Sequence, residues 1–146
     1  MSLSNDDFII YPKAQGRVPH DFQILPSFLL SELACPCIYL HCRATILYKP
    51  FLDLLQRIRD EIESPLIVTS CYRCSEKNRD VKGAALSAHL IGAGADIKSR
   101  NLSPLELVST VKGLGATGIG IYKNHLHIDL LLAPENQERW WNSPNS

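Results

Sequence analysis

The chain has 146 residues, an ordinary length for one domain, and its 45% apolar content is enough to build one core. Fifteen basic residues balance fifteen acidic ones, so no global field attracts the protein to nucleic acid or to an anionic membrane. No stretch reaches the ~18 apolar residues that a spanning helix needs, and the N-terminus lacks the basic and apolar regions of a signal peptide. We therefore expect one monomeric domain over residues 1–146, made in the cytoplasm, with no membrane span and no nucleic-acid partner.

Both ends of the chain show little periodicity. Residues 1–26 are interrupted by prolines, so we expect extended or irregular chain that wraps the domain. Residues 134–146 are expected to form a C-terminal tail. The adjacent Trp140 and Trp141 point in different directions, and we expect them to pack as part of a lid without a functional role.

The first helical pattern occupies residues 50–63. Its apolar residues recur at helical spacing: Phe51, Leu54, Leu55, Ile58 and Ile62. Pro65 ends this pattern, and residues 66–70 form a β-rich run suited to a buried strand. Ser75 is placed to cap a short helix that continues through Val81. We expect the longer helix to cover one face of a sheet.

The second half of the chain predicts one more helix among three strands. The sequence Ser-Pro-Leu-Glu at 103–106 is a capping box with proline at the first helical position, and glycines end the helix from position 113 onward. A strand is expected at 95–97 before this helix. Two further strands, at 118–122 and 125–132, are expected to form a hairpin.

Three residues of this half can supply ligands to one metal ion: His89, Asp96 and His127. Gly92 and Gly94 allow a tight bend, which lets the first two converge. A single histidine is more often a core or surface residue than a ligand, but the joint pattern favours zinc. Two imidazoles and a carboxylate leave a fourth tetrahedral position for water, which distinguishes a catalytic zinc from a structural one.

The same residues carry a family resemblance. The pattern Ser-x-His-x-x-Gly-x-small-x-Asp at 87–96, followed by Gly-Ile-Gly at 118–120 and His-x-Asp at 127–129, resembles the zinc D-alanyl-D-alanine carboxypeptidases and related phage cell-wall endopeptidases, the endolysins. Similar segments lie upstream, at residues 31–35, 65–70, 72–74 and 78. The resemblance covers roughly residues 27–133. It implies the fold shared with the hedgehog signalling domain, an α+β fold in which a small, mostly antiparallel sheet carries the metal and helices pack on it.

The resemblance also suggests roles for polar residues near the metal. Arg73 offers a planar fork for a peptide carboxylate or carbonyl, with a surface salt bridge as the alternative. Ser87 matches a serine that helps to position substrate, or it stabilises a loop through its hydroxyl. Asp129 could accept a proton from a ligand imidazole and fix its tautomer, or pair with Arg73 or Arg100.

Asn124 departs from the family pattern. Many relatives have a carboxylate three residues before the second histidine ligand, where it takes and returns the proton of the attacking water, and an amide cannot do this. His125 lies on the same predicted strand face as His127 and Asp129. Because histidine ordinarily titrates near neutral pH, His125 is the expected substitute for proton transfer or oxyanion stabilisation.

Five cysteines remain to be interpreted: Cys35, Cys37, Cys42, Cys71 and Cys74. Four of them could form a second, structural tetrahedral metal site, and an odd count leaves at least one thiol over. The Cys-x-x-Cys spacing at 71–74 is also found in redox motifs, but alone it is a weak signal. Buried thiols and a structural metal both remain open.

The predicted function is zinc-dependent hydrolysis of a peptide bond next to a D-amino acid, in peptidoglycan stem peptides or their cross-links. The resemblance does not distinguish carboxypeptidase from endopeptidase, or host from phage origin. Such an enzyme would reach the cell wall by release through a permeabilised membrane, or through a leader that this chain lacks. A catalytically silent zinc-binding module of the same fold is the alternative, and Asn124 favours it.

Overall fold

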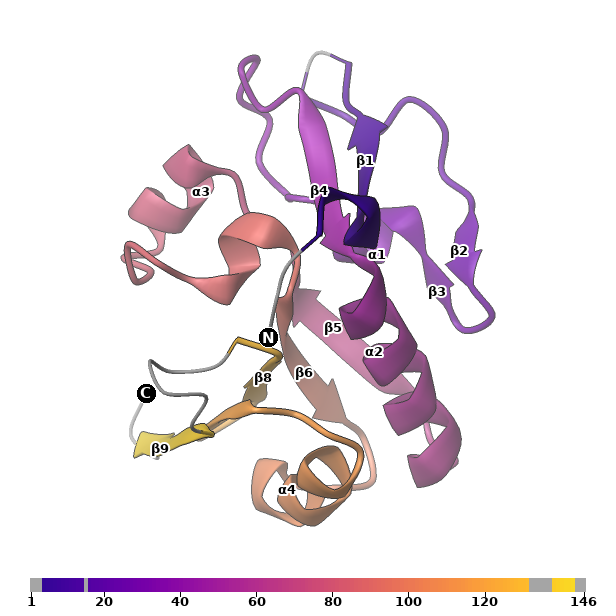
Figure 1. The fold of residues 1–146 in the computed structure, drawn as a ribbon, viewed down its shortest axis with the longest axis vertical. Coiled ribbons are helices and arrows are strands. Elements are labelled where there is room, and N and C mark those ends of the chain that lie inside the picture. Colours follow the sequence, from indigo (N-terminus) through magenta and orange to yellow (C-terminus); the bar gives the residue numbers. More distant parts are fainter. Residues whose placement is uncertain (1–3, 15, 132–137, 144–146) are drawn as a thin grey trace.

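The computed structural model describes residues 4–14, 16–131 and 138–143. The helices among them are η1 (Asn5–Asp7), α1 (Leu30–Leu33), α2 (Lys49–Ile62), α3 (Ser75–Asp80), η2 (Ala88–Ile91) and α4 (Pro104–Gly113). The strands are β1 (Phe8–Pro12), β2 (Gln23–Leu25), β3 (Phe28–Leu29), β4 (Ala44–Tyr48), β5 (Leu66–Ser70), β6 (Gly94–Ser99), β7 (Gly118–Tyr122), β8 (Leu126–Asp129) and β9 (Arg139–Ser143). Figure 1 shows their arrangement.

A five-stranded sheet in the order β5-β6-β8-β7-β9 forms the centre of the fold. All neighbouring strands are antiparallel except β7 and β9, which run parallel. Two-stranded sheets, β1 with β4 and β2 with β3, lie beyond it (Figure 1). The predicted α+β class with a small, mostly antiparallel sheet is confirmed.

Helices α2 and α4 cover one face of the central sheet. The buried residues of α2 fall at the predicted helical spacing, and a proline stands in its first turn, where the missing N–H costs nothing. In α4 the predicted capping box is present: Ser103 Oγ accepts the N–H of Glu106, and the Glu106 carboxylate accepts that of Ser103. Both helices therefore begin within one residue of the predicted start.

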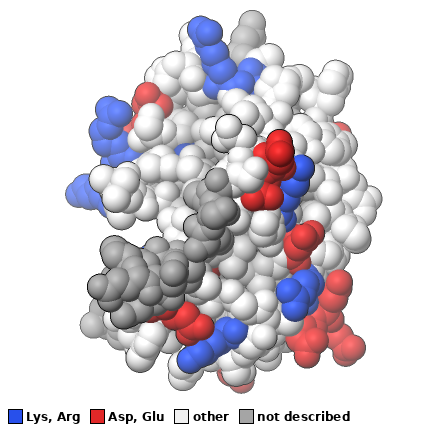
Figure 2. All heavy atoms as spheres, in the orientation of Figure 1, with Lys and Arg blue, Asp and Glu red and all other residues white. Residues whose placement is uncertain are grey.

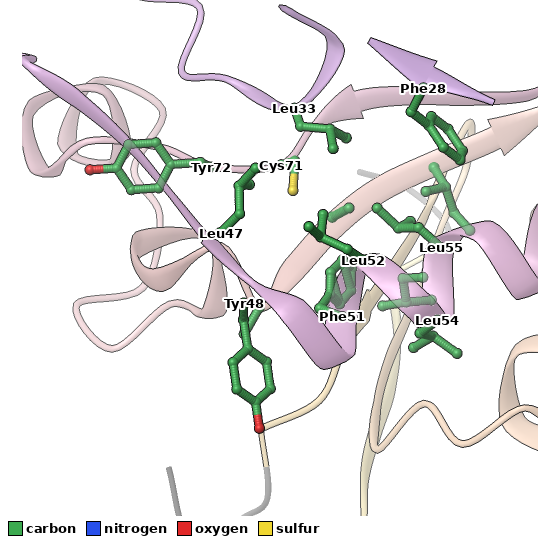
Figure 3. Close-up of a cluster of buried hydrophobic side chains, with 14 of the residues drawn as sticks. Phe28, Leu33, Leu47, Tyr48, Phe51, Leu52, Leu54, Leu55, Cys71 and Tyr72 are labelled. Carbon is green, nitrogen blue, oxygen red and sulfur yellow. The ribbon is translucent and has the colours of Figure 1, made fainter. Parts of the chain in front are cut away.

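One hydrophobic core fills the space between helices and sheet. Leu47 of β4, Phe51 and Leu55 of α2 are fully buried, and Figure 3 shows side chains of these two elements meeting Phe28 and Leu33. The sheet contributes residues of alternating positions: Ala95, Ile97, Leu126 and Ile128. Because side chains alternate along a strand, the residues between them face away from α2 and α4.

The N-terminal region is more regular than the sequence predicts. Within residues 1–26, β1 pairs with β4 and β2 pairs with β3. The run Thr45-Ile-Leu-Tyr48 in β4 has the β-branched and aromatic composition of a strand, so a signal for this pairing exists in the sequence. Within residues 134–146, strand β9 occupies part of the expected tail.

Charges on the surface follow the balanced composition. On the face shown in Figure 2, the described acidic and basic side chains form small groups, several of mixed sign. Among the described helices, none is both long and apolar enough to cross a membrane.

Candidate metal centre

One row of residues crosses all five strands of the central sheet. Ser70, Asp96, His127, Gly120 and Trp141 are paired in turn from β5 to β9. This row places Asp96 beside His127 on the face opposite α2 and α4, as two-residue periodicity requires. His89 joins them from η2, which contacts β6.

His89 is held in one orientation by the backbone. Its side chain is almost completely buried, and Nδ1 lies 2.6 Å from the carbonyl oxygen of Cys71. A carbonyl can only accept, so Nδ1 carries the proton and Nε2 carries the lone pair. Nε2 is buried, has no hydrogen-bond partner among the described residues, and lies 3.3 Å from Asp96 Oδ1. Burial lowers the pKa of His89, which favours the neutral ring.

His127 is held by carboxylates on both sides. Its Nδ1 lies 3.0 Å from Asp96 Oδ1 and its Nε2 lies 2.8 Å from Asp129 Oδ2. Burial opposes the charged ring, but the hydrogen bonds to Asp129 and Asp96 outweigh it and raise the pKa of His127. Burial alone would raise the pKa of Asp96, yet the neighbouring His127 and His89 rings hold it well below the usual range.

Asp129 is fixed by several partners. Its Oδ1 accepts the N–H of Leu131 at 2.9 Å and contacts the guanidinium of Arg139. This partner differs from Arg73 and Arg100, the two arginines considered as alternatives from the sequence. A Cβ at position 118 would lie 2.3 Å from Asp129 Oδ1, so only glycine leaves room for this pair.

Trp141 forms a wall of the site that the sequence did not predict. Its ring lies over Gly120, where an added Cβ would approach the indole to 2.4 Å. The ring centroid is 5.4 Å from that of His127, and Nε1 donates to Tyr122 Oη at 3.0 Å. From the sequence we expect Trp140 and Trp141 to pack together as a lid, but Trp140 is 72% exposed and only Trp141 packs over the site. No local signal in the sequence indicates that β9 pairs with β7.

The remaining predicted residues surround a cleft of about 340 Å³ that opens onto the metal centre. Arg73, Ser87 and His125 line it together with the residues already described. Ser87 Oγ also accepts the N–H of His89 at 3.3 Å, so the loop-stabilising alternative is realised. His125 precedes β8 rather than lying in it, because its carbonyl closes the turn with Tyr122 N.

The donor atoms fit a zinc ion. His89, Asp96 and His127 each offer one ligand atom, and these atoms lie within 4.8 Å of one another. Two imidazole nitrogens and a carboxylate are a ligand set of catalytic zinc sites. Each histidine also donates its other ring N–H to an oxygen, Cys71 O or Asp129 Oδ2, as the outer partners of zinc-bound histidines do. The assignment of these three residues as ligands stays a prediction, as do the catalytic and substrate-binding roles.

Comparison with known proteins agrees with this geometry. No curated protein matches the chain. The model of the family described as Peptidase M15 matches residues 26–129, a range that includes His89, Asp96, His127 and Asp129. The match covers more than half of the chain, and the earlier resemblance is thereby confirmed: this protein belongs to the M15 family of zinc peptidases.

Proposed function

We propose that this metallopeptidase hydrolyses a peptide bond next to a D-amino acid, in peptidoglycan stem peptides or their cross-links, and that it acts at the cell wall. Family membership supports peptidase chemistry. The finer assignment rests on the resemblance of the site motifs and on the polar lining of the cleft.

A single observation carries the proposal. His89 Nε2 and His127 Nδ1 both point at Asp96 Oδ1, from 3.3 and 3.0 Å, while the opposite nitrogen of each ring is bound to an oxygen. These residues would hold zinc, which when bound polarises the scissile carbonyl and activates a water molecule. The Cys71 carbonyl thus fixes the tautomer of His89, and Asp129 holds the Nε2 proton of His127, so that Nδ1 is the His127 nitrogen left to a metal.

Arg73 provides the cation for substrate binding. It lines the cleft, its backbone N–H donates to His89 O at 3.0 Å, and its buried Nε has no hydrogen-bond partner among the described residues. Burial lowers the pKa of Arg73, but a guanidinium remains charged at neutral pH. A peptide carboxylate or carbonyl would supply the acceptor that this group lacks.

His125 is the group we assign to proton transfer. The described carboxylates lining the cleft are Asp96 and Asp129, and both are engaged and have lowered pKa values despite burial. Neither can readily take a proton from water. His125 faces the cleft and stacks on Tyr122, with ring centroids 4.4 Å apart, so its imidazole can accept and return a proton.

Mass spectrometry of peptidoglycan fragments tests the proposal. Fragments incubated with zinc-loaded protein should acquire new termini, and His127→Ala should abolish them. His20→Ala is the matched control, because His20 is exposed and lies outside the cleft. Loss of a terminal residue would identify a carboxypeptidase, and opening of a cross-link an endopeptidase. Cleavage that survives His127→Ala would refute the proposal.

A silent zinc-binding module is the second candidate, and the position of Asn124 favours it. That residue stands where many relatives have the catalytic acid, and it is exposed and absent from the cleft lining. His125→Ala separates the two functions. If the protein is an enzyme, the His125→Ala variant should still bind zinc but should no longer cleave the fragments. If zinc-loaded wild-type protein itself leaves every fragment intact, the silent module is supported.

A further inference from the structure

A second group of metal-ligating side chains lies outside the cleft. The sulfur atoms of Cys35, Cys37, Cys42 and Cys74 lie within 4.8 Å of one another. The first three come from the chain between α1 and β4, and the fourth caps α3. Cys71 is not part of this group.

The spacing of the sulfur atoms suits a tetrahedral metal site. With metal–sulfur bonds of ~2.3 Å, the edges of a tetrahedron of four sulfurs are about 3.8 Å long. Cys74 Sγ lies 3.5 Å from Cys37 Sγ and 3.7 Å from Cys35 Sγ. A disulfide would use only one of these two contacts of Cys74, whereas one metal ion accommodates both at once.

Lys13 supplies an independent observation. It is 6% exposed, and its ammonium donates to the carbonyls of Cys35 and Cys37 and to Cys42 Sγ, at 3.0 to 3.2 Å. Among the described residues it forms no salt bridge with a carboxylate. A buried charge is costly unless it is compensated, and four thiolates around a divalent ion carry the excess negative charge that this ammonium needs.

Backbone N–H groups also point at the sulfurs. Lys77 N donates to Cys74 Sγ and Cys74 N donates to Cys35 Sγ, both at 3.4 Å. Such donors stabilise sulfur that carries negative charge, and the first of them lies in the first turn of α3.

We propose that Cys35, Cys37, Cys42 and Cys74 form a closed structural Zn²⁺ site, separate from the catalytic one. The four thiols lose their protons to solvent on binding, so no oxidant is required. The site ties the chain between α1 and β4 to the turn that carries Arg73. It is built to hold a fold together, since four protein ligands leave no position for water.

Metal analysis in the His127→Ala background isolates this site, because the cleft site is disabled there. We expect one zinc per chain in His127→Ala and none when Cys37→Ser is added. Cys37 is the most accessible of the four, so its replacement disturbs packing least. Cys71→Ser is the matched control: it replaces a buried cysteine outside the group and should retain the zinc.

Cobalt substitution gives a readout that needs no cysteine variant. Co²⁺ bound by His127→Ala should show intense sulfur-to-cobalt charge-transfer absorption in the near ultraviolet. Absence of both zinc and this absorption, or titration showing the four thiols oxidised in freshly purified protein, would overturn the proposal. Neither measurement depends on peptidase activity, so this site and the proposed function can fail separately.

Discussion

Asp129 shows how one residue determines the chemistry of another. Its carboxylate accepts from His127 Nε2, while Arg139 and the N–H of Leu131 hold its second oxygen. Three donors therefore converge on one buried carboxylate, and two of them, His127 and Arg139, outweigh the burial that would raise its pKa. Asp129 thereby holds the proton on His127 Nε2, and Nδ1, which faces Asp96, is the nitrogen that a metal would take.

Asp129→Asn should weaken zinc binding without removing a proposed ligand. The amide keeps the shape of the side chain but loses the charge that fixes the imidazole, and losses of this kind typically cost roughly 10–100-fold in metal affinity. Competition with a chromophoric chelator measures the affinity. Asp53→Asn, at an exposed position on α2, should leave it unchanged. Equal affinities for both variants would mean that Asp129 does not orient His127.

At the scale of elements, the parallel strand β9 completes the cleft. It pairs with β7 so that Trp141 faces Gly120 and Arg139 faces Gly118. Both glycines leave space that a Cβ would fill, at 2.4 Å from the indole and 2.3 Å from Asp129 Oδ1. The two glycines of β7 therefore leave the space that the Arg139 and Trp141 side chains of β9 occupy.

Gly120→Ala should loosen β9 and destabilise the fold. The added methyl group collides with the ring of Trp141, and overpacking of this kind costs about 1–3 kcal/mol in the free energy of unfolding. Gly113→Ala is the matched control, because a Cβ there meets no atom within 4 Å and the residue ends α4. That change should be neutral or stabilising by up to ~1 kcal/mol.

Urea denaturation of the two variants measures this difference, and tryptophan fluorescence reports whether Trp141 has moved. Equal free energies of unfolding for Gly120→Ala and Gly113→Ala would show that β9 and Trp141 move aside for the added methyl group without destabilising the fold.

Elements that depend on neighbouring residues could be predicted from the sequence, and those that depend on distant strand pairing could not. The capping box of α4 and the alternation along β8 are local, and both predicted their elements and the orientation of His127. The position of Trp141 depends on a parallel pairing with β7, for which a short strand carries no signal of its own. The likewise distant pairing of β1 with β4 was missed although Thr45-Ile-Leu-Tyr48 has strand composition.

The whole molecule brings the candidate metal ligands together from three elements. His89 comes from η2, Asp96 from β6 and His127 from β8, and the last two are neighbours only because the strands pair. An unfolded chain does not keep these donor atoms within 4.8 Å of one another. Zinc should therefore bind the folded state selectively and stabilise it by mass action.

Zinc at about a hundredfold excess over its Kd should raise the free energy of unfolding by roughly 2.7 kcal/mol. Urea denaturation at a series of free zinc concentrations measures the rise, and the slope against the logarithm of zinc concentration is compared between wild type and His127→Ala. Any stabilisation from the cysteine site contributes to both slopes, so their difference isolates His89, Asp96 and His127. Comparing slopes also removes the cost of the substitution itself, which shifts every point of the variant equally. Identical slopes would mean that these three residues do not bind zinc as one site. That result would contradict their assignment as the catalytic zinc ligands.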